Sequence, residues 1–143
     1  MGKFVTGYWA GITEEQMASQ PGFWNDTKAW GEWMVERGQH QDVLHAMKQL
    51  GVSALLTRTT LGVADAEIEW VAASELERAA LRLRELILAG HPEAARIVET
   101  YAKSANHVDP VSQELAQDLV DIAEIARFAQ REGVSRMTLQ VSW

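Results

Sequence analysis

Histidines and carboxylates are the side chains in this sequence that could carry out acid–base or metal chemistry. The chain of 143 residues has no cysteine, which excludes thiolate zinc sites, and its four histidines are His40, His45, His91 and His107. His40 and His45 are five residues apart, a spacing that does not place them on one face of a helix. His107 lies two residues before Asp109, but a loop that precedes a helix uses such an aspartate as its cap. The spacing therefore predicts no metal site, no cofactor and no catalytic histidine.

Motifs for nucleotide binding or serine hydrolysis are also missing from the sequence. The glycines do not form a G-x-G-x-x-G or a G-x-x-x-x-G-K-[ST] pattern, and no serine stands in a G-x-S-x-G turn. Carboxylates are numerous, but their separation and burial decide whether a pair catalyses a reaction. The sequence does not show these separations, so one hypothesis stays open: a small enzyme with a pocket between sheet and helices, in which Glu69 or Asp121 works with His45 or His107.

Two stretches of the chain carry acidic side chains and no basic ones, residues 59–77 and residues 109–126. The preference of acids for the first turn of a helix explains part of both stretches. It does not explain acids in the middle of a helix or on the outer face of a strand. The acids left over are Glu67, Glu69, Asp118, Asp121 and Glu124. We take them as candidates for a surface that binds a basic protein partner, with an ordinary solvated surface as the alternative.

Aromatic residues crowd the first 33 positions, and the chain has six tryptophans. Most of these rings should lie in the core, because large apolar side chains usually do. Phe23 and Trp24 differ from the rest, because they follow Pro21–Gly22 in a predicted loop and precede Asn25 and Asp26. A tryptophan exposed beside carboxylates is typical of protein interfaces, so Trp24 is a candidate anchor for a partner.

The last third of the chain predicts a long helix that leads directly into a terminal strand. Apolar residues recur at helical spacing from residue 111 to residue 129, and after Gly133 they alternate with polar residues up to Trp143. A capping box of Thr13 and Gln16 predicts a short helix, and a further helix is predicted from Asn25 or Asp26 to about Arg37. The other predicted helices lie at 41–50, 74–90 and 92–106, and the other predicted strands at 4–10, 52–60 and 67–71.

The two middle strands could form a hairpin, although residues 54–56 could equally continue a helix. Ser74 and Glu77 have the spacing of a second capping box. The order of elements predicts a single α+β domain with a small, mainly antiparallel sheet and about five or six helices. Both terminal strands should belong to that sheet.

Charge and hydropathy limit the partners of this domain. Twenty acidic and 13 basic residues give a net charge of -7, which argues against binding to the phosphates of a nucleic acid. The first ten residues do not form a signal peptide, and no stretch approaches the roughly 18 to 20 apolar residues that a membrane span requires. We therefore expect a cytoplasmic protein that binds neither nucleic acid nor membrane.

The layout of two segments resembles the small, acidic immunity proteins of bacteria. These segments are Trp70–Val71 with the helix that follows at 74–89, and the helix-to-strand unit at 127–143. The resemblance implies a non-catalytic protein that covers the active site of a cognate toxin, a basic enzyme or effector domain. A third hypothesis is a self-associating adaptor, in which an exposed edge of the final strand pairs with its copy in a homodimer.

Overall fold

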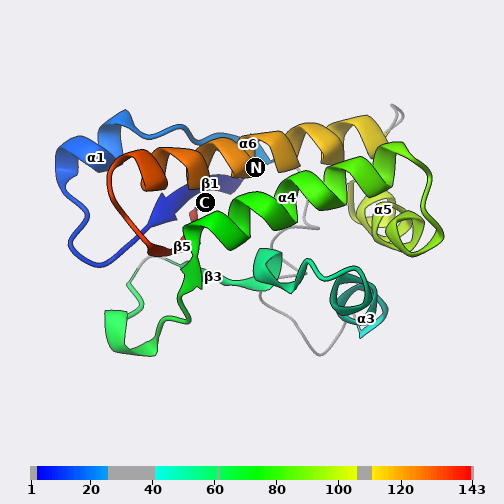
Figure 1. The fold of residues 1–143 in the computed structure, drawn as a ribbon, viewed down its shortest axis with the longest axis horizontal. Coiled ribbons are helices and arrows are strands. Elements are labelled where there is room, and N and C mark those ends of the chain that lie inside the picture. The colour runs from blue at the N-terminus through cyan, green and yellow to red at the C-terminus, as the bar shows by residue number, and fades with distance from the viewer. Residues whose placement is uncertain (1–2, 26–40, 61, 106–110, 143) are drawn as a thin grey trace.

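The computed structural model describes residues 3–25, 41–60, 62–105 and 111–142, which form one α+β domain (Figure 1). Its described part has five α-helices and a five-stranded sheet. Figure 1 shows helices α4 and α6 side by side across one face of the sheet, with α5 and α3 at one end. No described helix is long and apolar enough to span a membrane. The predicted fold class is therefore confirmed.

The sheet is built around the C-terminal strand. In chain order its strands are β1 (Lys3–Tyr8), β2 (Phe23–Asn25), β3 (Arg58–Thr60), β4 (Val71–Ala72) and β5 (Arg136–Ser142). The spatial order is β2-β1-β5-β3, with β4 pairing the first residues of β5. All pairs are antiparallel except β3 with β5. The prediction that both terminal strands share one sheet is confirmed, because β1 and β5 are direct neighbours.

Two predictions about these strands are wrong. β3 and β4 do not form a hairpin with each other, because each of them pairs with β5. β5 has no exposed edge at residues 139–141, where β1 pairs along one side and β3 along the other. The adaptor hypothesis required a free edge on this strand and loses its basis.

The helices follow the predicted apolar periodicity closely. They are α1 (Glu14–Ser19), α3 (Gln41–Gln49), α4 (Ala73–Leu88), α5 (Pro92–Ala105) and α6 (Val111–Arg131). The capping box that opens α1 is present, with the Gln16 amide donating to the Thr13 hydroxyl and Gln16 Oε1 accepting from the Thr13 amide. The helix predicted from residue 26 to about residue 37 lies outside the described residues. Short 3-10 turns η1 (Ser53–Leu56) and η2 (Asp65–Glu67) flank β3.

The N-terminus of α4 differs from its prediction. Ala72 is the N-cap residue and no side chain caps the helix, so the expected box of Ser74 and Glu77 does not form. Glu77 is instead turned toward α6, where it has partners on another element. The predicted stop at Gly90 is correct, because this residue has a φ of 73°, which glycine adopts without strain.

The core lies between α6, α4 and one face of the sheet. Register places Val5 opposite Val141 and Gly7 opposite Leu139, and α6 covers this face. A side chain at position 7 would not fit, since a Cβ there would lie 2.9 Å from Ile125 Cγ2. The close approach of α6 thus explains a glycine inside β1.

Gln20 binds the edge of β1 beyond the point where β2 ends. Its carboxamide accepts from the Gly7 amide at 2.7 Å and donates to the Gly7 carbonyl at 3.0 Å. β2 reaches only as far as Val5 on this side, so the buried Gln20 side chain takes the place of a neighbouring strand. The backbone groups of Gly7 are thereby satisfied, and this part of the edge is closed to other chains.

Candidate functional site

The predicted site residues lie on two sides of the sheet. Side chains alternate between the faces of a strand, so Phe4, Thr6 and Tyr8 point away from α6 when Val5 and Gly7 face it. We call the side of the sheet that carries Phe4, Thr6 and Tyr8 the outer face. Trp24 belongs to this face, and Asp118, Asp121 and Glu124 are on the helix that covers the other one.

Trp24 is an exposed aromatic residue at one end of the outer face. The prediction of a loop at this position is wrong, because Phe23 and Trp24 belong to β2. Phe23 pairs with Val5 and is buried, whereas Trp24 pairs with Phe4 and has 67% of its surface exposed. The rings of Phe4 and Trp24 lie 4.9 Å apart with a tilt of 43°. Phe4 therefore supports the indole while leaving most of it in contact with solvent.

Tyr8 holds an acidic loop at the other end of β1. Its hydroxyl donates to Asp65 Oδ1 at 2.7 Å, and its ring stacks on Trp70 with centroids 6.0 Å apart. The hydrogen bond to Asp65 raises the pKa of Tyr8 above its ordinary value of 10.0, and partial burial and the negative charge of Asp65 act in the same direction. Two contacts from one side chain thus tie the loop at residues 62–70 to the sheet.

Two further acidic residues of this loop, Glu67 and Glu69, are exposed. Glu67 ends η2 and Glu69 follows it in irregular backbone, so the strand predicted at residues 67–71 is wrong except for Val71. Both side chains are nevertheless exposed, as the prediction required. Phe4 and Tyr8 are four residues apart on β1, which corresponds to about 13 Å. The outer face therefore has an exposed indole at one end of β1 and the acidic loop at the other.

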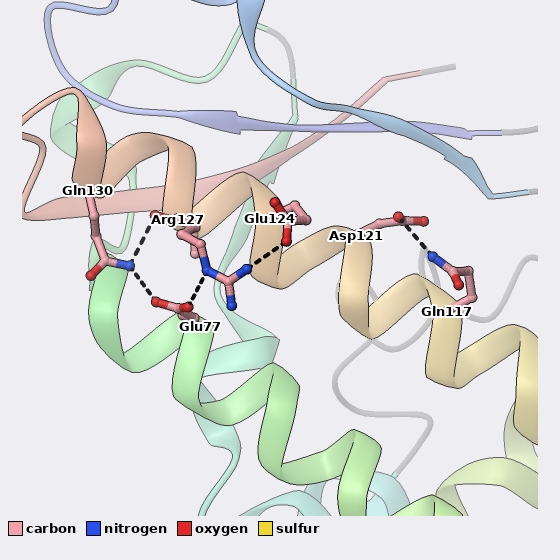
Figure 2. A network of polar contacts seen from close by, with 7 residues as sticks. Glu77, Gln117, Asp121, Glu124, Arg127 and Gln130 are labelled. Atoms are coloured by element: carbon pink, nitrogen blue, oxygen red, sulfur yellow. Dashed lines mark hydrogen bonds and ion pairs between the residues drawn. The ribbon is translucent and has the colours of Figure 1, made fainter.

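The acids of α6 have partners within the fold (Figure 2). Arg127 donates from Nε to Glu77 of α4 and from a terminal nitrogen to Glu124, both at 2.7 Å. Gln130 donates to the second oxygen of Glu77 at 2.8 Å. The hydrogen bond from Gln130, followed by the contact with Arg127, lowers the pKa of Glu77 despite the opposing effect of burial. These contacts fasten α6 to α4.

Asp121 is also less available than its place in the sequence suggested. Its side chain is partly buried and accepts from Gln117 Nε2 at 3.2 Å. Burial raises the pKa of Asp121 above its ordinary value, the Glu124 charge adds to this effect, and the bond from Gln117 opposes it. Asp118 is half-buried as well. The structure thus places the α6 candidates in partly buried positions, apart from the outer face.

The enzyme hypothesis paired Glu69 or Asp121 with His45 or His107, and the structure describes His45 but not His107. His45 is exposed on α3, and Figure 1 shows α3 at the opposite end of the molecule from the segment that joins η2 to β4. His91 is used locally, since its Nδ1 accepts from the Glu93 amide at 3.1 Å. His40 and His107 lie outside the described residues. Within the described ranges, no group of three or more potential ligands could hold a metal ion.

Comparisons with known proteins give no further identification. No family model, no curated protein and no solved structure matches this chain. The resemblance to immunity proteins therefore stays a prediction.

Proposed function

We propose that this protein is a non-catalytic inhibitor of the immunity type, which binds a basic toxin or effector domain and occludes its active site. The observation that carries the proposal is the outer face. There, the exposed Trp24 and the carboxylates Glu67 and Glu69 lie at the two ends of one strand. A large aromatic anchor with a charged periphery is the usual composition of a protein interface.

The two parts of this surface would have different tasks. Trp24 loses much apolar surface if a partner covers it, and its ring is already positioned by Phe4. Glu67 and Glu69 would attract a basic partner over a distance and align it, which acts mainly on the association rate. The net charge of -7 strengthens this attraction at low ionic strength.

The test is to capture a partner with the tagged protein from its native cells. We expect one stoichiometric protein with a basic sequence to be retained at low salt, and less of it at high salt. Trp24→Ala should lose the partner, because it removes the anchor from an exposed position and leaves the core intact. Leu88→Ala is the matched control, because Leu88 is also apolar and 55% exposed but lies on α4.

The captured protein should then be purified as an enzyme and assayed. Its activity should fall to the background as this protein is added up to an equimolar amount. Retention of the same partner by Trp24→Ala, or a partner whose activity is unchanged at saturation, would contradict the proposal.

A further inference from the structure

We propose that a second site, at the end of the sheet, binds an aromatic carboxylate. β1 ends and β5 begins there, and an open pocket of about 450 Å3 lies between them. Trp9, Trp70 and Arg136 line it together with the turn at residues 133–135. A volume of this size is in the range of pockets for small ligands, which extends from about 300 to 1,000 Å3. This site does not depend on the proposed function.

The walls of the pocket are held in place from behind. Trp9 has only 3% of its surface exposed and packs against Phe128 of α6, with ring centroids 6.4 Å apart. Trp70 stacks on Tyr8, and the hydroxyl of Tyr8 is held in place by its hydrogen bond to Asp65. The pocket therefore exists before a ligand enters, and binding does not have to order its aromatic side chains.

The polar side chains of the pocket favour a ligand that accepts hydrogen bonds. Arg136 is exposed, and in the part of the chain that the structure describes its guanidinium has no hydrogen bond or ion pair. Pairing of Ala72 with Arg136 fixes the backbone at this position. Guanidinium and indole N–H groups can donate but not accept. A carboxylate matches the fork of the guanidinium, and an aromatic ring matches the partly exposed indole of Trp70.

Net charge makes this chemistry selective. The protein carries a charge of -7, and Glu67 and Glu69 belong to the same loop as Trp70, so the surface beside the pocket repels carboxylates. Binding of one would need both the local positive charge of Arg136 and contact with the rings. An aromatic compound without the carboxylate, or a carboxylate without the ring, should bind much more weakly.

Hydrocinnamate is a suitable probe, with its neutral amide as the matched ligand. Titration followed by proton–nitrogen correlation NMR of the labelled protein would report on the indole N–H signals of Trp9 and Trp70. We expect saturable shifts with the acid, and binding of the amide that is weaker by at least about tenfold. Equal affinities for acid and amide, or no saturable shift with the acid, would overturn the proposal.

Arg136→Gln tests the residue that sets this preference. This substitution should lower the affinity for hydrocinnamate by about tenfold and leave the affinity for the amide unchanged. Arg131→Gln is the control, since it removes an equal charge from an exposed position on α6 outside the pocket. Weakening by Arg131→Gln to the same extent would refute a specific role for Arg136.

The same carboxylate chemistry is found in free metabolites and at the end of a peptide chain. A tripeptide that ends in phenylalanine with a free carboxylate separates these sources. If it binds more tightly than hydrocinnamate, the site accepts a chain end; if it binds more weakly, the site is shaped for a free acid. Failure of both ligands would remove the site altogether, whatever the outcome of the capture experiment.

Discussion

The acidic residues of α6 and those of the loop between β3 and β4 belong to two stretches that hold five acids each, but they differ in their surroundings. On α6, Glu124 is paired with Arg127, which also binds Glu77 on the neighbouring helix. On the loop, Asp65 binds Tyr8, and this contact holds Glu67 and Glu69 in exposed positions.

This difference shows that a run of acids is not in itself a binding surface. On α6, Glu124 is paired with Arg127, which also binds Glu77 of α4, and Asp121 accepts from Gln117. On the loop, Asp65 attaches the segment to Tyr8, and Glu67 and Glu69 are exposed on the surface, where a partner could meet them. The exposure of each carboxylate, and not the number of carboxylates, distinguishes the two regions.

Charge reversal should have the largest effect of the changes that we predict, and its effect on binding should differ between the loop and α6. If the loop faces a basic partner, Glu67→Lys with Glu69→Lys should weaken the complex by about a hundredfold at low salt, mainly through the association rate. Asp118→Lys with Asp121→Lys changes the charge equally on α6 and should weaken it by less than about tenfold. Surface plasmon resonance at two salt concentrations measures both. An equal loss from the two pairs would show that α6 belongs to the interface.

Removal of the charge of Glu77 should destabilise the fold without touching the outer face. At neutral pH we expect Glu77→Gln to lower the free energy of unfolding by about 1 kcal/mol, because Arg127 loses an ionic partner in a partly exposed place. The pKa of Glu77 is lowered in the folded state, so its contribution exists above the ordinary value of 4.5 and disappears as the pH falls through the folded value.

Urea unfolding over a pH series would measure this contribution. The difference between Glu77→Gln and the wild type should vanish in acid, and Glu67→Gln should show no difference at any pH, since Glu67 is exposed. A difference that persists in acid would mean that Glu77 acts through packing and not through its charge.

The elements that the sequence predicted well are those whose signal is local. The apolar stripe of α6, the alternation in β5 and the Thr13–Gln16 capping box each depend on neighbours along the chain. All three elements are confirmed, although Thr138, on the polar side of β5, is buried as well. Gln117 with Asp121 and Glu124 with Arg127 also have helical spacings, so these two contacts could have been recognised in the sequence.

The elements that the sequence predicted wrongly are determined by contacts between segments that are far apart in the chain. Glu77 matches the spacing of a capping box but binds Arg127, which is 50 positions away in the chain. Residues 67–70 alternate as a strand would, yet contacts of Asp65 and Trp70 with Tyr8 hold the segment as a loop. The sequence does not reveal such partners, and they narrow the site that we propose from five acids and Trp24 to Glu67, Glu69 and Trp24.

Loss of the Tyr8 hydroxyl should loosen the loop with a smaller effect on stability. We expect Tyr8→Phe to lower the free energy of unfolding by about 0.5 kcal/mol, since the bond to Asp65 is exposed. The pKa of Tyr8 is raised in the folded state, so the wild type should lose this advantage as the pH rises through the ordinary value of 10.0 and beyond. Hydrogen exchange at residues 62–70 should become faster, and exchange in α6 should not. Unchanged exchange in the loop would show that the Trp70 stack alone holds it.

Asp121→Asn should have the smallest effect, and it should be stabilising. Burial raises the pKa of Asp121, so the folded state holds its proton more tightly than the unfolded state and the ionised carboxylate opposes folding at neutral pH. Asparagine keeps an oxygen that can accept from Gln117, so we expect a gain of a few tenths of a kcal/mol. The gain should shrink as the pH falls and the wild-type carboxylate becomes protonated. A loss of stability at neutral pH would mean that Asp121 is held by favourable charge interactions, as the acids of a binding surface would not be.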